Sequence, residues 1–167
     1  MDELVRQIRI ALDSKLYYLA LYITLTLPDI SGALNSNDGI ATKERYIHWF
    51  NNYVTPQNAD STGDSLLKGD VAYKLRCSLL HQGKMELTNQ EYSRIIFSTP
   101  EGLMRVHCFK HQYDNGEIVL QLDVVEFCNQ VLSGLDQFLK EYGDSEQFQE
   151  NYKSFIAYYP DGIFPYA

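Results

Sequence analysis

Hydrophobic residues near the start of the chain recur every three or four positions, which is the spacing of one face of an α-helix. This stripe lies within residues 2 to about 27 and contains Leu4, Ile8, Leu12, Leu16, Leu19 and Ile23. It predicts one long helix, which ends before Pro28 because proline disfavours helical geometry in the preceding residue. A short turn or helical fragment and then a polar loop are predicted for residues 28–39.

Two more helices are predicted before residue 90. The first covers about 42–53, with Thr42 as its N-cap. The second begins at Asp70, which can cap the free amides of the first turn, and ends near residue 81 or 82 with Gly83 as a left-handed cap. The polar run 55–65 between them is predicted to be a surface loop.

The pattern changes after residue 90. Three runs rich in β-branched and aromatic residues, 92–99, 104–111 and 117–123, are separated by the turn sequences PEG and DNG. Alternating apolar residues in the last run are typical of a half-buried strand. We therefore predict a three-stranded antiparallel β-meander inserted into a helical protein.

The C-terminal region returns to helical spacing. Asp123 and Glu126 form a capping-box-like start for a fourth helix, which Gly143 ends. A shorter helix is predicted at about 145–157, before an aromatic tail. The predicted fold is mainly α, a helical bundle in a single domain: a helical region over residues 1–90, a β-meander over about 92–123, and C-terminal helices over 124–157.

Composition narrows the class of protein. The chain has 167 residues, of which 45% are hydrophobic and 22% charged, as in ordinary soluble domains. No apolar run approaches the ~20 residues that a membrane helix needs, and the first residues lack a signal-peptide pattern, so we expect a cytoplasmic protein without membrane contact. A net charge of −8 counts against a broad nucleic-acid-binding face but leaves room for a small basic pocket.

The cysteines and histidines give little sign of a metal or a cofactor. The chain has an odd number of cysteines, Cys77, Cys108 and Cys128, and no two of them form a CxxC pair. We therefore expect three free thiols. His107 and His111 have the HxxxH spacing that binds zinc from a helix, but four strand residues span ~13 Å, so we interpret both as solvated strand positions. No phosphate-binding or nucleophile motif occurs in the chain. The prediction is that neither a metal nor a cofactor is bound.

The stretch LRCSLLHQGK carries the strongest candidate chemistry. Arg76 and His81 lie five residues apart near the end of a predicted helix. On a helix their side chains point about 140° apart and are separated by ~7.5 Å along the axis, so we expect them to converge only if the helix frays or if a second copy faces the first. A protonatable imidazole and a permanently charged guanidinium together suit a phosphodiester substrate.

An arginine, four mainly apolar or small residues and a histidine, late in a helix of a helical core, resemble the motif of the HEPN superfamily (higher eukaryotes and prokaryotes nucleotide-binding). The resemblance extends over roughly the first half of the chain, through YYLALYITLTLPDISGAL, RYIHWFNNYV and GDVAYKLRCSLLHQGK. It implies a HEPN-like homodimer that brings two motifs to one cleft. In active members that cleft is a metal-independent ribonuclease site, and many members belong to toxin–antitoxin or other defence systems. By this resemblance, Arg76 would stabilise the phosphate and His81 would act as general acid or base on RNA.

Neighbouring polar residues are candidates for supporting this cleft. Asp29 would pair with Arg76 or orient His81, or else cap the turn that follows Pro28. Tyr73, Lys74 and Lys84 flank the motif and would contact phosphates, or else are ordinary solvated residues. Cys77 stands where many active members carry a polar residue.

Two functions follow from these residues. The first is an RNA-binding or RNA-cleaving protein with Arg76 and His81 at a dimer cleft, and a regulatory protein partner would be possible for such a protein. The alternative, which Cys77 and the acidic charge favour, is a catalytically silent module for dimerisation or partner binding.

Overall fold

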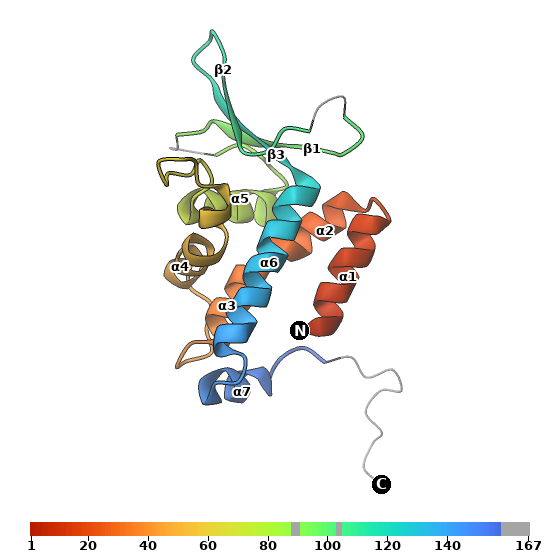
Figure 1. The fold of residues 1–167 in the computed structure, drawn as a ribbon, viewed down its shortest axis with the longest axis vertical. Helices are drawn as coiled ribbons and strands as arrows, with labels where there is room; N and C mark the ends of the chain where they lie inside the picture. Colours follow the sequence, from red (N-terminus) through yellow and green to blue (C-terminus); the bar gives the residue numbers. More distant parts are fainter. Residues whose placement is uncertain (88–90, 103–104, 158–167) are drawn as a thin grey trace.

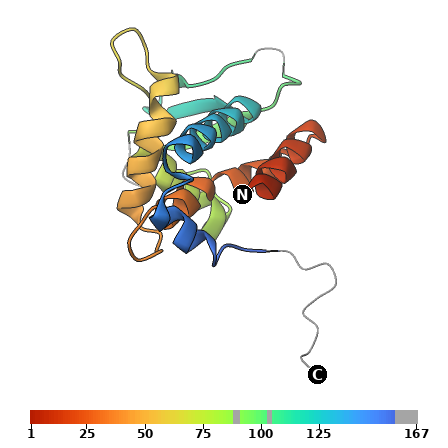
Figure 2. The same ribbon diagram turned by 60° about the horizontal axis from the view of Figure 1, so that its bottom comes forward.

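Seven α-helices and one 3₁₀ helix are seen in the computed structural model, which describes residues 1–87, 91–102 and 105–157. The helices are α1 (Asp2–Asp13), α2 (Tyr17–Thr24), α3 (Leu27–Leu34), α4 (Lys43–Tyr53), η1 (Thr55–Asn58), α5 (Gly69–Gln82), α6 (Val124–Tyr142) and α7 (Glu146–Tyr152). Helix α6 lies between α1 and α4 in both Figure 1 and Figure 2. The protein is therefore mainly α, as predicted.

The long helix predicted for residues 2–27 is wrong, because the chain turns twice within that segment. Helix α1 ends at Asp13, and Lys15 adopts a left-handed conformation with φ 58°. The amide of Leu16 then donates to the carbonyl of Ala11 at 2.8 Å and the amide of Lys15 to that of Leu12 at 3.0 Å, the two bonds of a Schellman ending. Pro28 also does not end a helix, since it lies in the first turn of α3, where its missing N–H costs nothing.

The next two helices match their predictions closely. Thr42 caps α4 and accepts a hydrogen bond from the amide of Arg45 at 3.3 Å. Helix α5 ends at Gln82, and Gly83 follows in a left-handed conformation with φ 64°. Only the start of α5 differs, because Lys68 occupies the N-cap position and Asp70 lies within the first turn.

The strands do not form a meander. Strand β3 (Ile118–Asp123) lies between β1 (Arg94–Ser98) and β2 (Phe109–Gln112), antiparallel to β2 but parallel to β1. The predicted antiparallel pairing is therefore correct for β2 and β3 only, which the DNG turn connects. The physical reason is burial, because β3 is the most apolar strand and the central position covers it from both sides.

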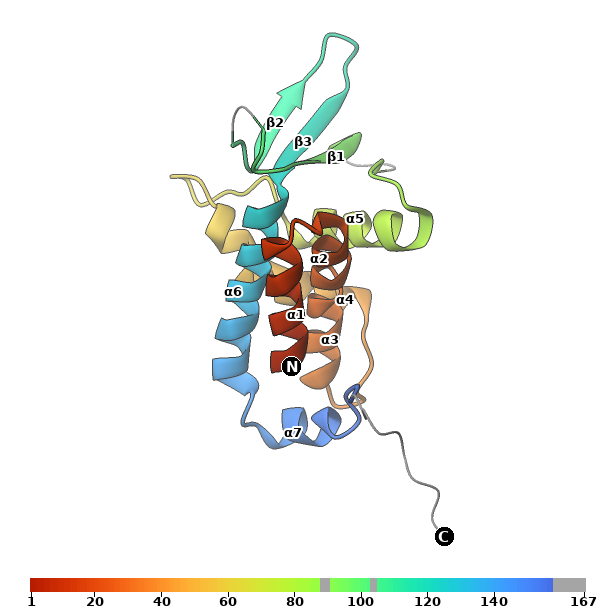
Figure 3. The ribbon, with the colours of Figure 1, turned by 90° about the vertical axis from the view of Figure 1, so that its right-hand side faces the viewer.

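The sheet lies at one end of the helical bundle, and α5 runs across the other helices near it (Figure 3). Strand β3 leads directly into α6, whose N-cap Asp123 accepts from the amide of Glu126 at 2.9 Å, as predicted. Gly143 is the C-cap of α6, also as predicted, and α7 is shorter than the predicted range 145–157. The predicted aromatic tail, from residue 158 onward, lies outside the described residues.

Several aromatic side chains of the core meet where α4 packs against α6. Trp49 of α4 packs edge to face against Phe138 of α6, with ring centroids 6.3 Å apart. Phe50 of α4 stacks on Phe127 of α6 at 6.4 Å. Close approach is possible because α6 has a glycine, Gly134, at the crossing. No helix within the described ranges is long and apolar enough to cross a membrane.

Candidate functional site on helix α5

Arg76 and His81 meet within one chain. The Nη1 atom of Arg76 lies 3.1 Å from Nε2 of His81, and its Nε atom donates to Oδ2 of Asp29 on α3 at 2.8 Å. Helix α5 is regular through Gln82, so the long arginine side chain closes the angular gap by itself. Neither fraying nor a second copy is needed to join the pair. Of the alternatives left open for Asp29, the structure shows the pairing with Arg76.

The ion pair between Asp29 and Arg76 is largely withdrawn from water. The side chains expose only 13% and 22% of their surface, respectively. Burial raises the pKa of the Asp29 carboxyl above its ordinary value, although the Arg76 cation opposes this shift. Burial alone would lower the pKa of Arg76, but the attraction of Asp29 raises it. Asp29 thus holds the guanidinium in place at some cost in desolvation.

His81 lies at the exposed end of the site. A guanidinium can only donate hydrogen bonds, so Nε2 of His81 is the acceptor and the ring hydrogen is on Nδ1. The lone pair of Nε2 and an N–H group of Arg76 therefore point at each other. An anion that replaces His81 as acceptor for Nη1 would lie directly beside a free imidazole nitrogen.

Two tyrosines, Tyr46 and Tyr73, lie near enough to the ion pair that the charges of Asp29 and Arg76 affect their pKa values. The rings of Tyr46 and Tyr73 pack edge to face with centroids 5.3 Å apart. The Tyr46 hydroxyl is buried and has no partner among the described residues. Burial and a hydrogen bond with Cys77 raise the pKa of Tyr73. The structure therefore places Tyr73 near the ion pair, half-buried rather than extended to the surface.

Cys77 connects the ion pair with a second group of predicted residues. Its sulfur lies 4.0 Å from Nη1 of Arg76. Cys77 also lines a groove of about 270 Å³ together with Lys74 and Lys84. Arg76 and His81 do not line this groove. The predicted supporting residues thus fall into two adjacent groups, one around Asp29 and one along the groove, which share Cys77.

His107 occupies a hydrogen-bonded site that no pattern in the sequence indicates. Its Nε2 atom lies 3.0 Å from Oδ1 of Asn58 and 3.1 Å from Oε1 of Gln130. Its Nδ1 atom accepts from the backbone amide of Asp123 at 3.2 Å. The prediction of a solvated strand position is therefore wrong for His107, which connects η1 with α6 and its N-cap residue.

The HxxxH spacing brings no metal ligands together. His111 lies in β2 and bonds to Gln121, with 2.8 Å between Nε2 and Oε1. Within the stretches that the structure describes, no three His, Cys, Asp or Glu residues are grouped so that they could hold a metal ion. The three cysteines are free thiols, as predicted.

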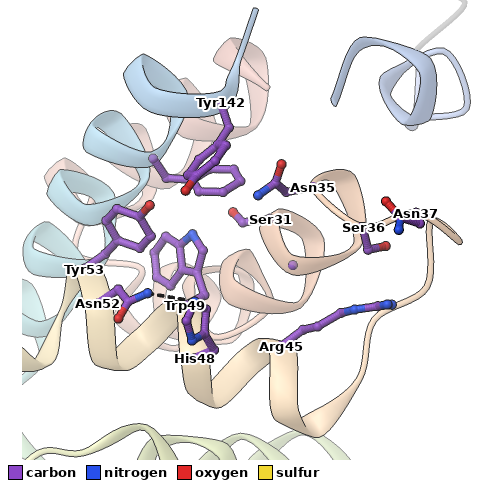
Figure 4. A pocket seen from close by; sticks show the side chains of 12 residues that line it. Ser31, Asn35, Ser36, Asn37, Arg45, His48, Trp49, Asn52, Tyr53 and Tyr142 are labelled. Carbon is purple, nitrogen blue, oxygen red and sulfur yellow. Dashed lines mark hydrogen bonds between the residues drawn. The ribbon is translucent and has the colours of Figure 1, made fainter. Parts of the chain in front are cut away.

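A cavity of about 300 Å³ between α3, α4 and α6 was not predicted (Figure 4). Its wall is largely polar and also contains aromatic side chains, among them Trp49, Tyr53 and Tyr142. Its residues come from α3, α4 and the loop between them, and from α6, which lies about 70 residues further along the chain. No local pattern in the sequence could have indicated it.

Comparison of the chain with family models, with curated proteins and with solved structures found no match.

Proposed function

We propose that this protein binds RNA at Arg76 and His81 and cleaves it without a metal ion. The observation that supports the proposal best is the 3.1 Å contact between a guanidinium N–H and an imidazole lone pair at the exposed end of α5. Arginine is suited to a phosphate because its charge is permanent and its N–H groups are arranged as a fork. The contact places a proton acceptor beside that fork.

The reaction that fits these groups is attack by the 2′-hydroxyl of RNA on the adjacent phosphorus. Nε2 of His81 would take the 2′-hydroxyl proton while Arg76 stabilises the charge that develops on the phosphoryl oxygens. The bond from phosphorus to the 5′-oxygen breaks, which leaves a 2′,3′-cyclic phosphate and, after protonation, a 5′-hydroxyl. DNA lacks the attacking hydroxyl and would not react.

The departing 5′-oxygen needs a proton, and one histidine that has just accepted a proton is badly placed to act on both sides of the phosphorus. A second copy of the chain would supply a second Arg–His pair as the acid. We therefore include a homodimer in the proposal, with α5 at or beside the interface. A monomer at micromolar concentration by light scattering would contradict this component of the proposal.

The test is incubation of pure protein with mixed RNA in the presence of EDTA. Wild type should cleave the RNA, and His81→Ala should be slower by about 10²–10⁴-fold, the typical contribution of a positioned acid or base. His111→Ala, which removes a histidine from β2, is the matched control and should cleave at the wild-type rate. Equal rates for all three proteins would assign the cleavage to another site or to a contaminant.

A second function, a catalytically silent interaction module, is favoured by three observations. Asp29 already neutralises Arg76, and the chain carries a net charge of −8. Leu16, Tyr18 and Leu19 are also apolar side chains that expose half or more of their surface around the start of α2. This module would form dimers or bind a protein partner, and it would neither bind nor cleave RNA.

A further inference from the structure

The cavity between α3, α4 and α6 contains two buried polar groups that have no partner among the described residues. Ser31 is 0% exposed and Trp49 is 3% exposed. The Ser31 hydroxyl and the Trp49 indole N–H both lack a hydrogen bond to any side chain or backbone group that the structure describes. Buried polar atoms are nearly always hydrogen-bonded, so two such atoms at one cavity point to something that fills it.

The orientation of these groups supports the same conclusion. Figure 4 shows the Ser31 oxygen and the Trp49 nitrogen turned toward the same space, with Tyr53 and Tyr142 on other sides of it. A serine hydroxyl within a helix commonly bonds back to the carbonyl four residues earlier, and the Ser31 hydroxyl does not. Both groups lie at the inner wall of the cavity without a hydrogen-bond partner among the described residues.

The lining of the cavity does not favour a charged ligand. The one ionic side chain among its lining residues, Arg45, extends away from this space toward the loop that carries Asn37 (Figure 4). There it forms an ion pair with Asp38 and donates to the carbonyl of Ile40. His48 is likewise bound to Asn52 at 2.9 Å. An anionic ligand would find no uncommitted cation among the described lining residues.

The shape and chemistry of the walls define the ligand further. Aromatic faces favour a flat molecule that stacks on them, and an indole N–H requires an acceptor. The volume of about 300 Å³ is at the lower end of the range for small-molecule sites. We propose that this cavity binds a neutral, planar heteroaromatic molecule of one or two rings, with a ring nitrogen that accepts from Trp49 and a second acceptor that faces Ser31.

The single tryptophan makes the proposal directly testable. Its indole N–H gives one resonance in a nitrogen–proton correlation spectrum. Quinazoline, whose two ring nitrogens accept hydrogen bonds, should shift this resonance downfield in a saturable way. Naphthalene has the same shape without an acceptor, and it should bind more weakly and leave the resonance without a downfield shift.

Two variants complete the experiment. Ser31→Ala removes one hydrogen bond and should weaken quinazoline binding about threefold to tenfold. Its fold should be kept, because the lost hydroxyl has no partner among the described residues. Thr24→Val changes a buried hydroxyl outside the cavity and should bind quinazoline as wild type does.

Three results would overturn the proposal. One is no saturable shift with quinazoline at millimolar concentration, which would mean that the cavity holds only water. Another is naphthalene binding as tightly as quinazoline. The third is unchanged quinazoline affinity in Ser31→Ala. None of these outcomes depends on RNA cleavage.

Discussion

Replacing Arg76 by alanine should destabilise the protein in a way that depends on pH. The change removes the cation that accompanies Asp29, whose side chain is only 13% exposed. The carboxylate would then remain in a poorly solvated position without its partner. Losing stability in this way is separate from losing activity, so it can be measured without RNA.

The expected size follows from the burial of the pair. An exposed ion pair contributes at most about 1 kcal/mol, whereas removing one partner of a fully buried pair costs about 3–5 kcal/mol. The pair of Asp29 and Arg76 lies between these limits, with 13% and 22% of the side chains exposed. We expect Arg76→Ala to lower the free energy of unfolding by about 2–3 kcal/mol at neutral pH.

The pH dependence has a definite sign. Burial raises the pKa of Asp29 in the folded protein, so the folded state holds this proton more tightly than the unfolded state does. The contribution of Asp29 is therefore most favourable below its unfolded pKa, and it is lost as pH rises through the folded pKa. Without Arg76, the pKa of Asp29 in the folded protein rises further. The loss of unfolding free energy in Arg76→Ala should therefore shrink as the pH falls from neutral through this raised pKa.

Urea unfolding at neutral pH and at about pH 4, near the ordinary aspartate pKa, measures this difference. The deficit of Arg76→Ala should fall below about 1 kcal/mol at the acidic pH, where a protonated Asp29 needs no partner. The double variant Asp29→Asn, Arg76→Ala should recover most of the deficit at neutral pH. Equal losses of stability at both pH values, or a double variant as unstable as the sum of the single ones, would show that an unpaired Asp29 carboxylate is not the cause.

Other predictions concern the core, the His107 site and the thiols. Gly134→Ala should destabilise by about 1–3 kcal/mol in urea unfolding, because its Cβ would lie 2.9 Å from Cβ of Tyr53; stability at or above wild type would contradict the close crossing. His107→Ala should lower the free energy of unfolding by about 2–3 kcal/mol, since it leaves buried hydrogen-bonding groups without their partner, and a change near zero would count against that network. Alkylation of the folded protein should modify Cys77 before Cys128, because burial raises the pKa of Cys128 to about 11; mass spectrometry of the peptides would show the reverse order if this is wrong.

The helices that were predicted well carry local signals at their ends. Thr42 and Asp123 cap the helices that follow them, and Gly83 takes the left-handed conformation expected after α5. These signals act within a few residues, so they can be recognised without knowledge of the fold. The N-terminal segment lacked such a signal, because Lys15 occupies a left-handed position where glycine is usual.

The errors in the sheet and at His107 have a nonlocal cause. Strand order depends on which strand gains most from burial on both sides, and this favoured β3 at the centre. His107 obtains its partners from Asn58 and Gln130, which lie 49 and 23 residues away. Hydrophobic periodicity contains no information about either.

The candidate site was partly predictable. The spacing of Arg76 and His81 identified the two residues, and the position of Asp29 suggested the ion pair that the structure contains. Helix geometry alone placed the two side chains about 140° apart, because it treats side chains as short and rigid. The flexible arginine and its anchor on α3 bring the two groups to 3.1 Å.

The most direct test of metal-independent RNA cleavage at Arg76 and His81 is the cleavage rate of the double variant Asp29→Asn, Arg76→Ala. It is measured with EDTA beside wild type. This variant should be nearly as stable as wild type, so a loss of activity cannot be attributed to unfolding. Wild type should leave 2′,3′-cyclic phosphate ends, and the double variant should be slower by about 10²–10³-fold, as for the loss of one group that stabilises developing charge. A folded double variant that cleaves RNA as fast as wild type, or a wild-type protein that does not cleave RNA, would contradict the central claim.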